Sequence, residues 1–257
     1  MILLRSALFN LFFYTATLAL TVGPATVLRF AAPDRVLDVA QLWGRLMLRA
    51  LRVICDITVD VSGLEHLDGD AAALIASHHQ SAFDTFVWLT LLPRCTYVLK
   101  HELLRIPLFG PLLPAAGMIA VDREGGAAAL RRLVRDGERA ARQARQIVIF
   151  PEGTRAPPGV VLPLHPGVAA LAARTGLPVI PAVTDSGRCW GRRAFHKRPG
   201  VIHLRLLPPI PATLGRAHLM SRLEEALRTD VFATAQAVEN SVGRVAAQLA
   251  HQRSPRA

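Results

Sequence analysis

Lysine and cysteine are scarce in this chain of 257 residues, which has only two lysines and three cysteines. The cysteines are odd in number, and Cys55, Cys95 and Cys189 fit no zinc-binding or redox spacing. We therefore expect small buried apolar residues rather than a disulfide framework, in keeping with a reducing compartment. The chain also lacks the Gly-x-Ser-x-Gly pattern, so no serine nucleophile of the hydrolase type is predicted.

Because only Lys100 and Lys197 are lysines, arginine carries nearly all of the positive charge behind a net charge of +11. Arginine suits planar, bidentate contacts with phosphate, although a biased genomic base composition would produce the same excess. A basic chain is expected to bind either nucleic acid or an anionic membrane.

The N-terminal segment favours the membrane. Ser6 to Leu28 carries no charged residue over 23 positions, and about 20 apolar residues suffice to span a bilayer. Asn10 and Pro24 weaken that interpretation, so the segment could instead bend and lie in one leaflet. A cleaved signal peptide is the third alternative, which we disfavour because its apolar core is normally only about 7–15 residues long.

Residues 36–54 continue the apolar theme but interleave it with Arg45, Arg49 and Arg52. One interpretation is a basic helix at the membrane interface, with Trp43 at the level of the lipid headgroups. The other is an ordinary helix that packs on the domain. The sequence leaves both open.

Short apolar runs alternate with helical patterns along the rest of the chain. Strands are predicted at Ile57–Val61, Ala73–Ala76, Thr96–Leu99, Met118–Val121, Ile147–Phe150, Val179–Val183 and Val201–Leu207, and helices at Ala82–Leu91, Ala127–Ala144, Pro166–Thr175 and from Ser221 to about Ala250. This alternation predicts an α/β fold with a mostly parallel central sheet and helices on both faces. We expect a membrane-anchoring segment at 1–35, the main domain at 36–215, and a helical extension with a disordered tail at 216–257.

A basic loop is expected between Gly187 and Gly200, where five cations surround two aromatic residues. These are Arg188, Arg192, Arg193, Lys197 and Arg198 around Trp190 and Phe195. Aromatic residues among cations suit a lipid headgroup interface, but they suit RNA equally well.

The segment from Ser77 to Asp84 carries the strongest chemical signal, because His79 stands five residues before Asp84. A histidine held by a carboxylate is a general base that can deprotonate an alcohol. On a straight helix, five positions would place the two side chains roughly 140° apart. Ser81 is a natural N-cap, so a helix that begins at Ala82 would leave His79 in the preceding loop, free to fold back on Asp84.

The same residues allow a purely structural interpretation. Ser81-x-x-Asp84 before an apolar run is also a capping-box pattern, so Asp84 could serve only to cap the helix. His78 competes with His79 for the role of base. The residues alone do not decide between these alternatives.

Further groups follow predicted strands. Phe150-Pro151-Glu152-Gly153-Thr154-Arg155 places a cation, a hydroxyl and a tight turn where a phosphate could bind. Gly117 to Arg123 is a strand that ends in Asp122 and Arg123. A third segment, Lys100-His101-Glu102-Leu103 through Pro107, adds a further cation.

Taken together, over about residues 70–210, these segments resemble the glycerolipid acyltransferases, specifically the 1-acylglycerol-3-phosphate acyltransferase family. The resemblance selects His79 as the general base and Asp84 as the carboxylate that orients it. It implies that the acceptor phosphate is bound by Arg123, Glu152, Gly153, Thr154 and Arg155, with Lys100 as a possible donor or acceptor contact. Two departures stand out: His78 replaces a common Asn or Lys, and His165 stands where many members have Lys.

The resemblance implies transfer of a fatty acyl group from acyl-CoA or acyl carrier protein to the sn-2 hydroxyl of 1-acylglycerol-3-phosphate, without a protein nucleophile. It implies no cofactor, and we predict no metal site. The expected partners are lysophosphatidic acid, an acyl thioester and anionic membrane lipids, at a bacterial inner membrane with the site facing the cytoplasm. The alternatives are another lysolipid acceptor, such as a lyso-ornithine lipid, and a membrane-attached nucleic-acid-binding protein.

Overall fold

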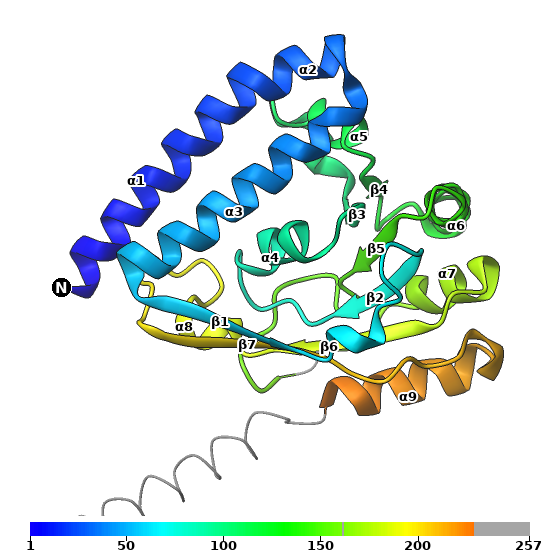
Figure 1. Ribbon diagram of the computed structural model, residues 1–257. Coiled ribbons are helices and arrows are strands. Elements are labelled where there is room, and N and C mark those ends of the chain that lie inside the picture. Colours follow the sequence, from blue (N-terminus) through cyan, green and yellow to red (C-terminus); the bar gives the residue numbers. More distant parts are fainter. Residues whose placement is uncertain (161, 229–257) are drawn as a thin grey trace, which may run out of the picture.

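The computed structural model describes residues 1–160 and 162–228. Its centre is a sheet of seven strands in the order β1-β7-β6-β2-β5-β3-β4 (Figure 1). The strands are β1 (Ile57–Ser62), β2 (Ala73–Ser77), β3 (Cys95–Lys100), β4 (Ile119–Val121), β5 (Gln146–Ile149), β6 (Val179–Thr184) and β7 (Gly200–Leu206). All seven predicted strands are confirmed to within about one residue at each end, a difference of the size expected between assignment criteria.

The sheet is mostly parallel, as predicted. Strands β6, β2, β5, β3 and β4 all run in one direction, and only the pair β6–β7 is antiparallel. Strand β7 then pairs in parallel with β1 at the edge. Five neighbouring strands therefore end at the same edge of the sheet, where α/β proteins place their ligands.

Helices cover both faces of this sheet. The helices are α1 (Ile2–Leu20), α2 (Thr26–Ala31), α3 (Val36–Cys55), α4 (Asp84–Leu91), α5 (Leu112–Ala115), α6 (Gly126–Arg142), α7 (Gly167–Thr175), α8 (Ser186–Cys189) and α9 (Arg216–Arg228). Strand β2 is buried along its whole length. Its Ile75 packs with α3 and α4 on one face, whereas Leu74 and Ala76 pack with α6, α7 and α9 on the other. Such two-sided burial is typical of a central parallel strand.

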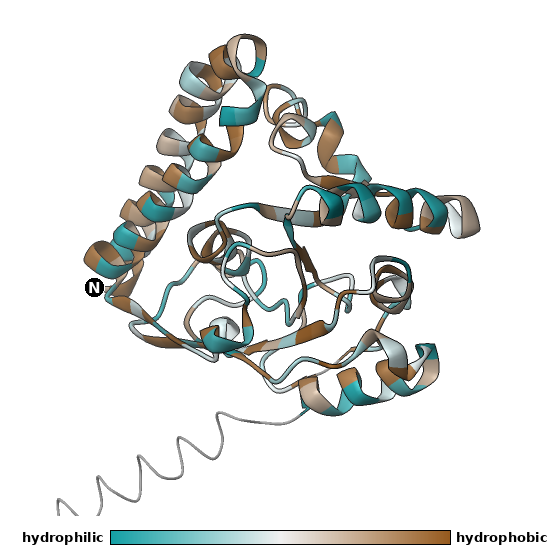
Figure 2. Cartoon of the chain, turned by 45° about the vertical axis from the view of Figure 1, so that its right-hand side comes forward, coloured by the Kyte–Doolittle hydropathy of each residue, from teal (hydrophilic) through white to brown (hydrophobic). Residues whose placement is uncertain are grey.

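The N-terminal segment forms a long apolar helix, and α3 then runs back alongside it (Figure 1). Residues Ile2–Ala31 are long and apolar enough to cross a membrane, by length and composition only. Figure 2 shows the hydrophobic residues along this helix and the mostly hydrophilic surface of α6. The segment Thr21–Ala25 is a π-helical turn with non-helical backbone angles at Gly23, next to Pro24. The helix therefore bends at the proline that the sequence analysis named.

Helix α3 packs against α1 and α4, which favours the second of the two interpretations of residues 36–54 (Figure 1). Trp43 does not reach outward to a headgroup level. Its indole Nε1 donates to Thr17 Oγ1 at 2.9 Å, and its ring meets Phe13 and Phe86 edge to face. The arginines of α3 lie on its exposed side.

The basic loop is more buried than its composition suggested. Lys197 is only 2% exposed, and its ammonium donates to Asn10 of α1 and to the Phe195 carbonyl. Trp190 is also buried, and its ring packs edge to face on Phe9. Both residues therefore hold the loop to α1.

Helix α9 begins at Arg216, five residues before the predicted Ser221. The rest of the predicted C-terminal helix and tail lies outside the described residues. The three cysteines are free and buried, as expected.

Phe9 tests whether α1 is part of the folded domain. Because its ring is fully buried against Trp190, Phe9→Ala should lower the free energy of unfolding in detergent by about 3–5 kcal/mol. Leu11 on the same helix is 63% exposed, so Leu11→Ala is the matched control and should change the midpoint of thermal unfolding little. Equal effects of the two variants would contradict this packing.

Candidate functional site

The candidate site lies at the carboxyl ends of the five parallel strands. His79 follows β2, the Glu152–Arg155 turn follows β5, Lys100 ends β3, Arg123 follows β4, and Ser186 follows β6. Since these strands are neighbours in the sheet, residues that are far apart in the chain, from His79 to Ser186, meet at one edge.

His79 and Asp84 are in contact. His79 Nδ1 lies 3.1 Å from Asp84 Oδ2. The same carboxylate is 1% exposed and accepts the backbone N–H groups of Gln80 at 2.7 Å and Ser81 at 2.8 Å. Its other oxygen, Oδ1, accepts the hydroxyl of Ser186 at 2.7 Å. A carboxylate that accepts from so many donors is an acceptor towards His79 too, so Nδ1 carries the hydrogen and Nε2 is left as the basic atom.

The loop geometry explains why five residues separate the pair. Helix α4 begins at Asp84, two residues later than the predicted Ala82, because the chain first makes a turn in which Ser81 Oγ accepts the N–H of Phe83 at 3.2 Å. Asp84 accepts the N–H of Ser81 in return. The Asp84 side chain therefore bonds both to the turn that precedes the helix and to His79, so the contacts behind both interpretations of the sequence are present.

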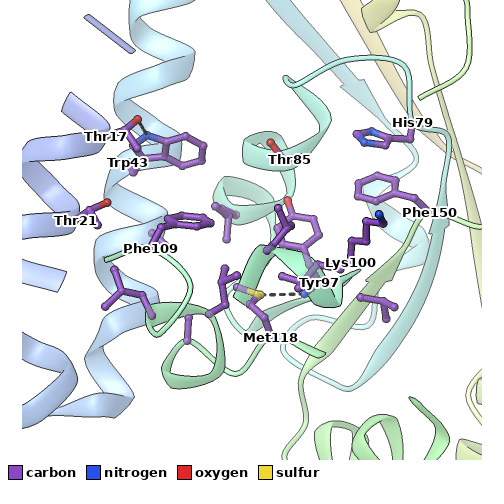
Figure 3. A pocket seen from close by; sticks show the side chains of 18 of the residues that line it. Thr17, Thr21, Trp43, His79, Thr85, Tyr97, Lys100, Phe109, Met118 and Phe150 are labelled. Atoms are coloured by element: carbon purple, nitrogen blue, oxygen red, sulfur yellow. Dashed lines mark hydrogen bonds between the residues drawn. The ribbon is translucent and has the colours of Figure 1, made fainter. Parts of the chain in front are cut away.

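The imidazole plane is fixed by aromatic stacking. The ring of His79 stacks on Phe150, with centroids 4.3 Å apart and an interplanar angle of 23°. Phe150 in turn stacks on Tyr97 at 6.0 Å. Figure 3 shows His79 above Phe150 at one end of the pocket. The orientation of the His79 imidazole is thus set by the Asp84 carboxylate at Nδ1 and by the ring of Phe150 against its face.

His78 is placed differently from its neighbour. It is 8% exposed, and its Nε2 has no hydrogen-bond partner within the described residues. Burial lowers the pKa of His78 to about 4, although the Asp84 carboxylate opposes this shift. His78 is therefore neutral near pH 7 and has no bond to Asp84 among the described contacts, so the geometry favours His79 as the base.

The turn after β5 presents cations beside the histidine. Gly153 has φ of +69°, and a Cβ there would lie 2.8 Å from the ring of His165. Glycine is required by both the left-handed backbone and this close approach. Arg123, from the end of β4, donates to the Gly153 carbonyl. Burial lowers the pKa of Arg155, and the nearby Asp84 carboxylate opposes that shift.

Glu152 does not face an anion. Its Oε2 accepts the backbone N–H of His79 at 3.1 Å, and its Oε1 accepts that of Leu162 at 3.4 Å. It thus ties the turn after β5 to the loop that carries His79, whereas the resemblance implied a contact with the acceptor phosphate. Asp122 similarly accepts the N–H of Glu124 at 3.0 Å. Lys100 is exposed and pairs with Glu102 at 2.5 Å.

A cavity of about 530 Å³ joins these groups. Its polar end contains His79, Thr154 and Arg155, and its apolar end lies among residues of α3, α5 and the N-terminal segment. Figure 3 shows Trp43, Phe109 and Thr21 at the end opposite His79. The volume is that of a small-molecule site, and its shape suits a ligand with an anionic head and an apolar tail.

Sequence reasoning missed Ser186. This residue is fully buried, and it holds the Asp84 oxygen that His79 does not touch. The signal was available: Thr184-Asp185-Ser186 is a polar run directly after the apolar strand β6. Asp185 fixes the run by accepting both the N–H of His203 at 2.7 Å and its Nδ1 at 3.0 Å.

No group of three or more His, Cys, Asp or Glu side chains placed to hold a metal ion occurs within residues 1–160 and 162–228.

Known proteins are similar to this chain over most of its length. The family model described as Acyltransferase matches residues 58–185. The 1-acyl-sn-glycerol-3-phosphate acyltransferase of Pseudomonas aeruginosa is 35% identical over 81% of this chain and 81% of its own length. The enzyme of the same name from Limnanthes alba is 30% identical over 73% of this chain and 67% of its own length.

The chain belongs to the 1-acyl-sn-glycerol-3-phosphate acyltransferase family. This confirms the resemblance drawn from the motifs. The fold also matches the crystal structure of the 1-acyl-sn-glycerophosphate acyltransferase PlsC from Thermotoga maritima, with a TM-score of 0.69, 23% identity and coverage of 90% of this chain and 97% of that chain.

Ser186 gives the first test of the site. Ser186→Ala should lower kcat for acyl transfer by roughly 10- to 100-fold with little change in the KM of the acceptor, because a hydrogen bond to a charged group contributes about 1.5–3 kcal/mol. Steady-state kinetics measure both constants. Ser77 is the matched buried control, since its hydroxyl donates to the His78 carbonyl at 2.9 Å and not to Asp84. An unchanged kcat in Ser186→Ala would show that Asp84 needs no support from this hydroxyl.

Glu152 gives a test by pH. Burial raises its pKa from 4.5 to about 7, so the folded protein binds this proton more tightly than the unfolded chain. Stability should therefore fall as pH rises through that window, by at most roughly 3 kcal/mol. Glu152→Gln removes the titrating carboxyl group. The unfolding temperature of the wild type should therefore fall relative to that of the variant as the pH rises from 5 to 8. Parallel curves for the two proteins would contradict the assignment.

Proposed function

We propose that the protein transfers a fatty acyl group from an acyl thioester, acyl-CoA or acyl carrier protein, to the sn-2 hydroxyl of 1-acylglycerol-3-phosphate, forming phosphatidic acid. The observation that carries this proposal is the position of the His79–Asp84 pair. It stands where a cation-lined wall meets an apolar cavity. An acceptor with a phosphate, a free hydroxyl and an acyl chain offers one group to each of these three environments.

In the proposed reaction, His79 Nε2 takes the proton of the acceptor hydroxyl as the oxygen attacks the thioester carbonyl. The new C–O bond gives a tetrahedral intermediate, which collapses with cleavage of the C–S bond. The imidazolium then returns the proton to the departing thiolate, so that a thiol leaves and the base is restored. Asp84 stabilises the imidazolium and keeps Nε2 directed at the substrate.

The acceptor phosphate is assigned to the cationic wall. Arg155 and Thr154 line the cavity beside His79, and Arg123 reaches the same turn from β4. Gly153 allows the tight backbone, and Glu152 braces it without facing the ligand. Lys100, at the end of β3, lines the same cavity as a donor or acceptor contact. Several arginines suit a phosphate, which binds guanidinium groups in a bidentate way. An ornithine headgroup offers one carboxylate beside an ammonium group, so the cationic wall supports lysophosphatidic acid over a lyso-ornithine lipid.

The apolar end of the cavity is assigned to an acyl chain. Leu20 and Thr21 of the N-terminal segment form this end together with Val36 of α3 and Leu112 of α5. The apolar helix Ile2–Ala31 therefore lines the same cavity whose polar end holds the base. Association of this helix with a bacterial inner membrane, with the site on the cytoplasmic side, would let a lipid substrate enter without crossing water.

The test is acyl transfer by the detergent-purified protein, with acyl-CoA and acyl carrier protein as donors and lysophosphatidic acid and a lyso-ornithine lipid as acceptors. We expect phosphatidic acid from the wild type, and a loss of about 10²–10⁴-fold in kcat for His79→Ala, since this is the usual contribution of a general base. Full activity of His79→Ala would refute the mechanism. Product from the lyso-ornithine lipid alone would keep the mechanism and overturn the acceptor.

A further inference from the structure

The cavity has a second pair of cations that none of the motifs contains. Arg192 and Arg193 line it together with Arg155. They belong to the loop between α8 and β7, which follows β6, whereas Arg155 follows β5. Strand β2, which carries His79, lies between β5 and β6. Cations from both flanking strands therefore converge on the cavity beside the base.

The two guanidinium groups have no counter-charge of their own. Within residues 1–160 and 162–228, neither Arg192 nor Arg193 forms an ion pair. Arg192 also lies near enough to Arg155 for the like charge to add to the lowering of the Arg155 pKa that burial causes. Arginines that gather at one wall without forming ion pairs of their own are favourable when an anion lies between them.

The turn that carries the pair is held rigidly. Trp190 on one side is buried, and its Nε1 donates to the Ala194 carbonyl at 3.2 Å. Lys197 on the other side is pinned to α1, since its backbone N–H donates to Ser6 Oγ at 2.9 Å. Arg193 itself has φ of +55°, a conformation that an arginine adopts at a cost of about 1 kcal/mol or more. Because this turn is already fixed in the free protein, little conformational entropy of its backbone is lost when an anion binds to the two side chains.

We propose that Arg192 and Arg193 complete the acceptor site, so that the phosphate of the lysolipid is held jointly by Arg155 from the β5 side and by this turn from the β6 side. The inference rests on the proposed function and deepens it. A phosphomonoester carries about two negative charges at pH 7. Its glycerol C2 hydroxyl is only a few bonds away, so a phosphate beside Arg155 lets that hydroxyl reach His79. Arginines that contact the phosphate near His79 thereby select acceptors that carry a phosphate.

The experiment compares the wild type with Arg192→Gln/Arg193→Gln in nonionic detergent micelles free of anionic lipid. The KM for lysophosphatidic acid should rise roughly tenfold or more, as for loss of a charge-assisted hydrogen bond, while the KM for acyl-CoA stays the same. Slow acylation of a monoacylglycerol, which has no phosphate, should be unchanged. The matched control is Arg198→Gln, because Arg198 is exposed on the same loop and does not line the cavity.

Direct binding of sn-glycerol 3-phosphate by calorimetry gives a second readout, and it should weaken in the double variant but not in Arg198→Gln. Arg155→Gln should combine non-additively with Arg192→Gln in this assay, since both would contact one phosphate. If the wild type makes no phosphatidic acid, the proposed function fails, and this binding assay alone decides the inference.

Three results would overturn the inference. A rise in the KM for acyl-CoA instead would assign the pair to the donor. A defect seen only with vesicles containing anionic lipid would assign it to the membrane surface. Unchanged constants and unchanged binding of sn-glycerol 3-phosphate would show that the pair binds neither substrate.

Discussion

The site depends on a single buried carboxylate. Asp84 receives hydrogen bonds from the loop after β2 and from the loop after β6, and it starts helix α4. An ionised group so far from water is stable only if its oxygens are paired, and here each has at least one donor. The same bonds that satisfy the charge fix the loop, and the fixed loop aims His79. The hydrogen bonds that hold this part of the fold therefore also orient His79.

The order of the strands explains why distant segments share this site. Strand β2 lies between β5 and β6, so the base is flanked by the turn that carries Arg155 and by the loop that carries Ser186. Backbone bonds connect the three: Ala156 donates to the His79 carbonyl at 2.7 Å, and Gly187 donates to Gln80 Oε1 at 3.1 Å. The loops thus form one hydrogen-bonded layer above the sheet, and a cation on either side has a defined place relative to the base.

Much of this could be predicted from the sequence because its signals are local. Apolar runs identified every strand, and the spacing of His79, Ser81 and Asp84 predicted a loop in which His79 folds back on Asp84. What the sequence could not show depends on partners remote in the chain. Ser186 is 102 positions from Asp84, and no local pattern relates them. Trp190 and Lys197 look like surface residues in a basic loop, yet packing on Phe9 and Asn10 of α1 buries both.

That burial links the apolar N-terminal helix to the catalytic loops. Helix α1 contacts α3 along its length and holds the Gly187–Gly200 loop through Lys197. Burying an ammonium group costs free energy unless it is well paired, and this one is met by an amide oxygen, a carbonyl and three aromatic rings. Residues of the same N-terminal segment also line the apolar end of the cavity. A shift of this segment would therefore move both the apolar end of the cavity and the turn that carries Arg192.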